Sequence, residues 1–327
     1  MSERRPGRLA RLALGALGYV AGLLLGMAVS AAPARAGTLR YCDAPPALSA
    51  AQQDQMLRVS AVIKDELERS GTRAALIARS GLNLRLFDKR YSHAGLSLRA
   101  SADTRWSVRQ LYFACDEALP RLFDQGLSGF ILGTEDPALG YISVVTLPAE
   151  AAAALEPVAL DNRQALSLLS PNYSANAYAW SLEFQNCNQW LIELLGLAWG
   201  AAVPVPDAAW MPASLPSDKT ARATAQGWLR AQGYEAAVFP MRWRPLMWLT
   251  AFSPWLHTVH HPEEELARAR FVVSMPESIE TFVRAQVPGA ERLEFCHTAE
   301  HVVVRRGWQP LADGCVPGDG DRVIALH

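Results

Sequence analysis

The sequence predicts an α+β protein in which helices pack on a mixed or antiparallel sheet. Apolar residues recur at helical spacing in residues 50–70 and again in 187–200. Residues 90–99 instead alternate in polarity, and residues 106–115 are rich in β-branched and aromatic side chains, as strands are. With 50 % hydrophobic and 19 % charged residues, the 327-residue chain has a globular rather than a disordered composition.

The first half of the chain predicts one long helix followed mainly by strands. Ser49 and Gln52 form a capping box, and an apolar face runs from Met56 to Leu67 before Gly71 ends the helix. Downstream we expect strands at residues 74–80, 90–99, 106–115 and 140–147, and short helices at 116–125 and 150–155.

The second half predicts a strand at 173–184 and then a helix that begins at Cys187, with Asn186 as its N-cap and Gly200 at its end. Four prolines between residues 204 and 216 indicate a linker. Beyond it we expect helices at 217–232 and 276–286, and strands at 271–275, 301–306 and 322–326. The Trp-rich segment at 242–257 is expected to be buried, with a lid or membrane-surface segment as the alternative.

The N-terminus has the pattern of an exported protein. An uncharged run, Leu12 to Ala32, follows four arginines and precedes the small-residue triplet Ala34 to Ala36, which predicts a secretory signal peptide cut before Gly37. The run approaches the roughly 20 residues that span a bilayer, so an uncleaved anchor in the inner membrane is the alternative. We therefore expect a periplasmic protein, with membrane association through the N-terminus if the leader is retained.

Composition shifts divide the chain into four parts. They are the signal peptide or anchor at 1–36, a core at 37–204, a Pro-rich linker and helical segment at 205–270, and a C-terminal α/β appendage at 271–327 that closes on the core.

The charge balance disfavours nucleic acid as a partner. The whole chain has a net charge of −1, and residues 1–36 carry five arginines against one glutamate, which leaves the remainder at −5. No basic stripe, RNA-binding motif or paired Cys/His ligand set accompanies this charge. The sequence also lacks a phosphate-binding or dinucleotide-binding glycine loop, and we expect no cofactor.

Five cysteines in an oxidising compartment leave one unpaired. Pairing neighbours in sequence order gives Cys42–Cys115 and Cys296–Cys315, the second closing a loop of 19 positions. Cys187 then remains as the free thiol.

Cys187 and His93 are the first candidates for chemistry. A helix N-terminus favours a thiolate through its partial positive charge and free N–H groups. His93 lies on a predicted strand where Ala94 and Gly95 leave room for a close neighbour, so its imidazole is a candidate base. An inert buried thiol and a structural histidine explain the same residues equally well.

Two histidine patterns suggest a metal more weakly. The string His297 to His301 matches an inverted zincin motif, but Val302 to Val304 continue it as a strand, which favours a chance match. His257, His260 and His261 precede three glutamates and are more typical of a solvated turn than of a metal site. We therefore expect no metal.

The fragments Tyr91 to Leu96 and Asn186 to Leu191 resemble the two signature strings of the circularly permuted papain-like superfamily. That superfamily includes lecithin-retinol-acyltransferase-like proteins and relatives of bacterial cell-wall amidases. A wider set of fragments, at 180–190, 276–279, 306–308 and 313–315, resembles an exported bacterial domain of unknown function (DUF2145-like). The resemblance implies a permuted papain-like core in which the histidine strand precedes the cysteine helix.

The same resemblance implies site roles. The superfamily takes the group that orients its histidine from the following strand, where Gln110 is our choice and Arg109 the alternative. Cys187 would be the nucleophile and His93 the base. Gln185 or the backbone N–H of Cys187 would stabilise an oxyanion, with Asn186 as an auxiliary residue.

The expected function is that of a periplasmic thiol-dependent hydrolase or acyltransferase, which acts on an amide, ester or thioester of a cell-envelope peptide or lipid. The alternative is a non-catalytic envelope or binding module that retains the papain-like fold.

Overall fold

The computed structural model describes residues 48–114, 116–134, 136–200, 217–241, 247, 253 and 255–326. All of them fall within one compact unit, Tyr41–His327. The predicted leader, the Cys42–Cys115 pair, the Pro-rich linker and most of the Trp-rich segment lie outside the described residues.

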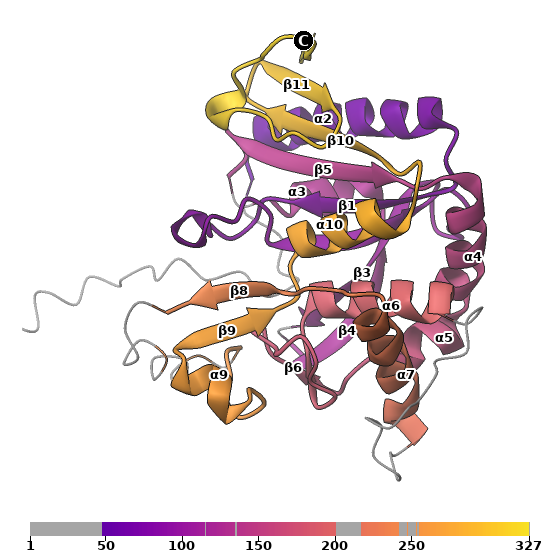
Figure 1. Cartoon of the computed structure of the whole chain (residues 1–327). Helices are drawn as coiled ribbons and strands as arrows, with labels where there is room; N and C mark the ends of the chain where they lie inside the picture. The colour runs from indigo at the N-terminus through magenta and orange to yellow at the C-terminus, as the bar shows by residue number, and fades with distance from the viewer. Residues whose placement is uncertain are drawn as a thin grey trace, which may run out of the picture. The chain divides into compact units, whose positions relative to one another are not determined.

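An antiparallel sheet is the framework of the described chain (Figure 1). It contains eight strands in the order β12-β11-β10-β5-β1-β2-β3-β4, and every neighbouring pair is antiparallel. In chain order they are β1 (Ala74–Arg79), β2 (His93–Leu98), β3 (Ser107–Ala114), β4 (Leu119–Gln125), β5 (Gly140–Thr146), β10 (Glu291–His297), β11 (His301–Arg306) and β12 (Arg322–Ala325).

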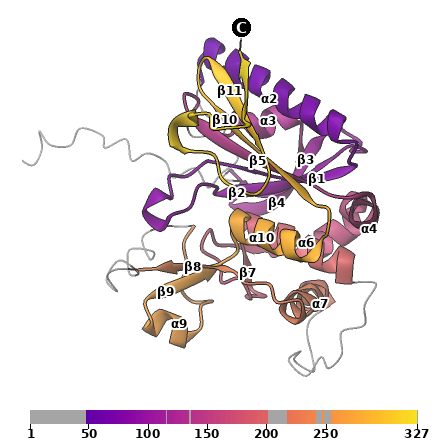
Figure 2. The same ribbon diagram turned by 45° about the horizontal axis from the view of Figure 1, so that its top comes forward.

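Helices cover both faces of this sheet, as Figure 2 shows. On one face, α2 (Ala50–Ser70) and α3 (Leu127–Leu132) close a core that contains Met56 and Phe130. On the other, α4 (Ala149–Leu160), α6 (Cys187–Gly200) and α10 (Pro276–Gln286) close a larger core around Trp190. The fold class is therefore α+β, as predicted.

Helix α2 begins and ends where its sequence predicts. The Ser49 hydroxyl accepts the backbone N–H of Gln52, the Gln52 side chain accepts the Ser49 N–H, and Gly71 takes the left-handed conformation (φ 71°) at the C-terminus. The capping box and the glycine stop are both confirmed.

Three expectations about strands were wrong or incomplete. A helix was expected at residues 116–125, but Leu119–Gln125 forms β4 instead, because it pairs with β3 from Leu119 opposite Ala114 to Gln125 opposite Val108. The expected strand at 173–184 reduces to two parallel two-residue strands, β6 (Asn172–Tyr173) and β7 (Phe184–Gln185). Strand β10 was not expected from the sequence; it pairs with β5 and so joins the C-terminal strands to the main sheet.

The remaining elements lie outside the main sheet and the helices named above. They are the 3-10 turns η1 (Arg85–Phe87) and η3 (Asp313–Cys315), the helices α5 (Asn162–Ser167), α7 (Ser217–Ala231) and α9 (Glu263–Ala267), and the strand pair β8 (Ala237–Pro240) with β9 (Arg270–Val273). None of the helices within the described ranges is both long and apolar enough to cross a membrane.

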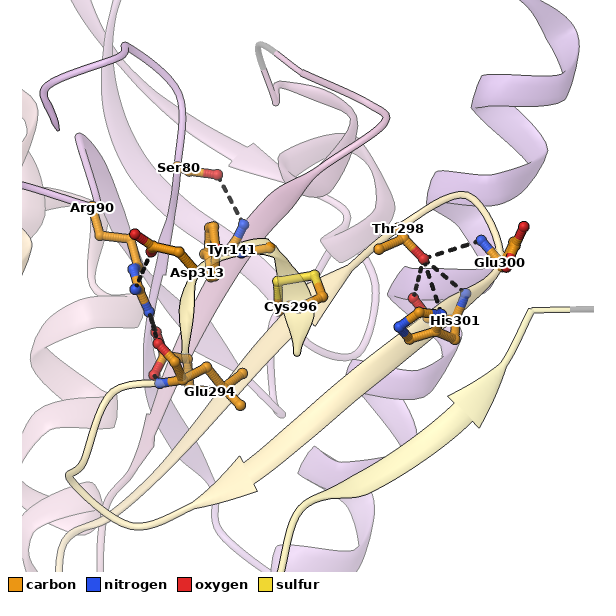
Figure 3. Close-up of a disulfide and its surroundings, with 12 residues drawn as sticks. Ser80, Arg90, Tyr141, Glu294, Cys296, Thr298, Glu300, His301 and Asp313 are labelled. Atoms are coloured by element: carbon orange, nitrogen blue, oxygen red, sulfur yellow. Dashed lines mark hydrogen bonds and ion pairs between the residues drawn. A yellow bond between two sulfur atoms is a disulfide. The ribbon is translucent and has the colours of Figure 1, made fainter. Parts of the chain in front are cut away.

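The Cys296–Cys315 disulfide is confirmed, and Figure 3 shows its surroundings. It ties η3 to β10, with the two Cα atoms 5.2 Å apart. Beside it, Arg90 contacts Glu294 (2.8 Å) and Asp313 (2.8 Å), so the C-terminal loop is held to the segment that leads into β2.

Candidate functional site

The N-terminal turn of α6 presents the free thiol. Asn186 Oδ1 accepts the backbone N–H of Gln189 at 2.7 Å, which confirms Asn186 as the N-cap and makes Cys187 the first residue of the helix. The Asn186 amide also donates to the carbonyls of Ala175 and Ser274, which fixes the entry of the chain. Cys187 is unpaired and only 7 % exposed.

His93 begins β2 and is held by Gln110 of β3. The His93 Nε2–H donates to Gln110 Oε1 at 2.5 Å, and the Gln110 amide donates in turn to Gln125 Oε1 at 2.8 Å. Because Nε2 carries the proton in this arrangement, Nδ1 is the nitrogen left to accept one. The imidazole also packs against Tyr112 and Phe130, with ring centroids 4.7 and 5.8 Å away.

The thiol and the imidazole lie at the same end of β2. Asn188, the second residue of α6, donates from Nδ2 to the Ser92 carbonyl at 3.2 Å, so the helix start adjoins the residue before His93. Cys187 packs in the core beneath α6, whereas Phe130, a ring neighbour of His93, belongs to the core beneath α3. Among the described residues, no hydrogen bond joins the Cys187 sulfur to the His93 ring.

Burial dominates the electrostatics of both groups. It raises the pKa of the Cys187 thiol to about 12, against the opposing effects of the Asn188 N–H, the Arg79 charge, the N–H of Cys187 itself and the Tyr173 hydroxyl. Burial and the Arg79 charge lower the pKa of His93 to about 3, and the hydrogen bond to Gln110 opposes them. At neutral pH both groups are uncharged in this structure.

Arg79 is a site residue that the sequence analysis missed. It ends β1 directly opposite His93 in the β1–β2 register and is 4 % exposed. Its guanidinium donates to the Gly133 carbonyl and, at 3.2 Å, to the Tyr112 hydroxyl. A lone charge that closes the apolar run Ala74 to Ala78 was the signal in the sequence that could have identified it.

Gln185, an expected oxyanion donor, is fully occupied elsewhere. Its amide donates to the Leu168 carbonyl (2.9 Å) and to Glu193 Oε2 (2.6 Å). No amide hydrogen of Gln185 is left for a substrate, so of the two expected donors only the backbone N–H of Cys187 remains a candidate. Arg109, the alternative to Gln110, is paired with Asp124 at 2.5 Å and does not bond His93.

The histidine patterns have structural roles. His297 lies in β10 and His301 in β11, joined by a turn, so the zincin-like string does not form a helix. His261 donates from Nε2 to the Asn176 carbonyl at 2.8 Å and is buried, so the expectation of a solvated turn was wrong there. Within the part of the chain that the structure describes, no cluster of His, Cys, Asp or Glu could hold a metal ion.

Comparison with known proteins places the chain in a family. Residues 66–283 match the family described as "Uncharacterized protein conserved in bacteria (DUF2145)", and this match covers α6, β2 and β3. No curated protein and no solved structure matches the chain. Since the matched residues include Cys187, His93 and Gln110 and span more than half of the sequence, the chain belongs to the DUF2145 family.

Proposed function

We propose that this protein is a thiol-dependent hydrolase or acyltransferase of the cell envelope, with a permuted papain-like core. The observation that carries the proposal is that a free thiol at a capped helix start lies at the same end of β2 as an imidazole whose Nε2 is held by Gln110. A nucleophile, a base and a group that orients the base are the minimum for covalent acyl transfer.

The proposed reaction begins with transfer of the thiol proton from Cys187 to His93 Nδ1. The sulfur then attacks the carbonyl carbon of an amide, ester or thioester, and the backbone N–H of Cys187 donates to the oxyanion. The imidazolium returns its proton to the leaving group as the carbon–heteroatom bond breaks. Water, or a second acceptor, then displaces the sulfur from the acyl group.

Both side chains of the proposed pair are buried in this structure. Both side chains are 7 % exposed, and no hydrogen bond yet joins them within the described chain. Catalysis therefore requires substrate binding to bring the sulfur and Nδ1 within about 3–3.5 Å. The same burial also supports the alternative, a non-catalytic binding module. A thiol that stays buried and protonated does not act as a nucleophile and needs no base beside it.

Turnover separates the two functions. The assay follows the release of p-nitrophenol from p-nitrophenyl acetate and of amines from muropeptides, together with labelling by an iodoacetamide probe. Cys187→Ser and Cys187→Ala should abolish turnover, and His93→Ala should lower it by about 10²-fold or more. His301→Ala, a histidine outside the site, is the control and should leave turnover unchanged.

If the wild type does not turn over these substrates, and Cys187→Ala is labelled as strongly as the wild type, only the binding module remains. Gln110→Leu tests the remaining role. It should reduce turnover less than His93→Ala does, because the base is still present but its ring is no longer held.

A further inference from the structure

A short strap, residues 255–261, lies against loop 174–178 and is hydrogen-bonded to it. The His257 N–H donates to Asn176 Oδ1 at 3.0 Å, and the Asn176 amide donates in return to the His257 carbonyl at 3.0 Å. The Ala175 N–H donates to a further carbonyl of the strap at 2.8 Å. Several contacts, spread along both segments, therefore dock the strap.

Two more of these contacts are made by histidine rings. His260 Nδ1 accepts the Tyr178 N–H at 3.2 Å, and His261 Nε2 donates to the Asn176 carbonyl at 2.8 Å. The remaining ring nitrogens, His260 Nε2 and His261 Nδ1, are buried without a hydrogen-bond partner among the described residues. A proton on His260 Nδ1 would remove an acceptor, and one on His261 Nδ1 would bury a donor without a partner. The docked strap therefore needs both rings neutral.

The packing of the two rings also disfavours a positive charge. The His260 ring centroid lies 4.6 Å from that of His261 and 4.6 Å from that of Phe184. Burial, followed by the charges of His261 and His257, lowers the pKa of His260 to about 3, against a backbone hydrogen bond. Burial lowers the pKa of His261 to about 4, against a backbone hydrogen bond and the Glu265 charge.

The charged and titratable groups on the neighbouring elements supply no hydrogen-bonded carboxylate to either ring within the described chain. Glu265 of α9 acts on His261, but Arg268 and Arg270 already lie 3.7 and 2.8 Å from that carboxylate. The ring centroid of Tyr178 is 5.9 Å from that of His261. The charged groups that act on Tyr178 are Arg230, Glu265 and Glu264.

We propose that His260 and His261 make the strap an acid-sensitive latch, in which neutral rings hold it on loop 174–178 and protonated rings release it. This inference goes beyond the proposed reaction and does not depend on it. The Asn186 amide donates to the Ala175 carbonyl, so release frees the loop that contacts the N-cap of α6.

The direction of the response follows from linkage. A released ring binds a proton with the ordinary histidine pKa of 6.5, whereas the docked rings bind one only near pH 3 and pH 4. Release is therefore favoured as the pH falls below 6.5. Each histidine shifts the equilibrium by up to about tenfold per pH unit, which is about 30-fold for each at pH 5.

The test is hydrogen exchange of the full chain at pH 7, 6 and 5, read by mass spectrometry and corrected for the intrinsic effect of pH on exchange. In the wild type, amide protection of the strap and loop 174–178 should fall by about tenfold or more from pH 7 to pH 5, with about 10³-fold as the limit. Protection of β1 and β5 should change less than threefold. A fall below tenfold in the strap, or an equal fall in β1 and β5, would overturn the inference.

Variants of the two rings identify the titrating groups. His261→Gln keeps a donor for the Asn176 carbonyl, and its strap should respond about 30-fold less at pH 5 than that of the wild type. The double variant His260→Phe with His261→Gln keeps a ring against Phe184 and should show a response near zero. A wild-type response in a folded His261→Gln protein would overturn the inference, even if the double variant does not dock the strap.

His297→Leu is the matched control. It removes a buried histidine of the main sheet whose pKa is also lowered, to about 4, and it leaves the strap untouched. Its strap should respond to acid as the wild type does. A response lost in His297→Leu would assign the effect to the main sheet and overturn the latch.

Discussion

Two buried arginines, Arg222 and Arg79, differ in whether a carboxylate pairs with them. Arg222 of α7 is 1 % exposed and meets Glu193 at 2.8 Å, midway along α6, where Gln185, Gln189 and Gln226 also donate to that carboxylate. Arg79, which ends β1 opposite His93, forms no ion pair with a carboxylate among the described residues. A paired buried charge fixes packing, whereas an unpaired one is available to chemistry.

The largest expected effect comes from breaking the paired region. Glu193→Ala leaves the Arg222 charge buried without its carboxylate, and we expect it to reduce the free energy of unfolding by about 3–5 kcal/mol. Urea unfolding followed by circular dichroism measures this loss. The double variant Glu193→Leu with Arg222→Met should recover most of it, because both charges are then absent. A Glu193→Ala protein as stable as wild type would contradict the pairing argument.

Arg90 is a third arginine with carboxylate partners, Glu294 and Asp313, and a disulfide holds the segments that carry them together. The Cys296–Cys315 disulfide keeps η3, and with it Asp313, beside Arg90 (Figure 3). Replacing both cysteines by alanine should cost about 3 kcal/mol, as expected for a loop of this length. Unfolding with and without reductant checks it: the reductant should destabilise the wild type more than the double variant, by the contribution of the Cys296–Cys315 bridge.

A neutral unpartnered group offers a contrast with Arg79. Both ring nitrogens of His297 are buried without partners, and burial lowers its pKa from 6.5 to about 4. The unfolded chain binds the proton first as the pH falls, so His297 makes stability decline from about pH 6.5 down to about pH 4, by up to about 1.4 kcal/mol per pH unit.

His297→Leu should flatten this part of the stability profile without loss at pH 7, which unfolding across pH 4–8 would show. His93, His260 and His261 also have lowered pKa values and will keep some of the slope in the variant. An identical slope in wild type and variant would mean that His297 is protonated in the folded protein.

The smallest stability effect should come from Arg79 itself. Arg79→Met loses two hydrogen bonds worth about 1 kcal/mol each but also removes an unneutralised buried charge, so the net change should be within about 1 kcal/mol. Urea unfolding of this variant beside Glu193→Ala tests the contrast directly. A loss as large as that of Glu193→Ala would assign Arg79 to the framework rather than to the site.

The sequence predicted an element correctly where a local signal in the sequence agrees with the packing of that element. The capping residues Ser49 and Asn186 set the starts of α2 and α6, and the alternation around Ala94 and Leu96 gave β2. The choice of Gln110 as the partner of His93 came from the family resemblance and not from periodicity, and the structure shows their hydrogen bond.

The predictions failed where contacts between residues far apart in the sequence determine the secondary structure or the partner of a side chain. Residues 119–125 have no strand alternation of their own and become β4 because β3 supplies a ladder. The carboxylate partners of Arg222 and Arg109 and the lack of one for Arg79 depend on contacts across the fold, which periodicity does not report. For the same reason, the occupation of the Gln185 amide by Glu193 was not predictable.

The order of the strands has a consequence for biosynthesis. Strand β5 is flanked by β1 on one side, but its other edge is covered by β10, whose Glu291 lies opposite Thr146. A ribosome must therefore add about 145 further residues before that apolar edge can be paired, and non-local pairing of this kind is slow and exposed to aggregation. Chains that terminate before residue 291 would present β5 as an open edge, a template for association with other chains.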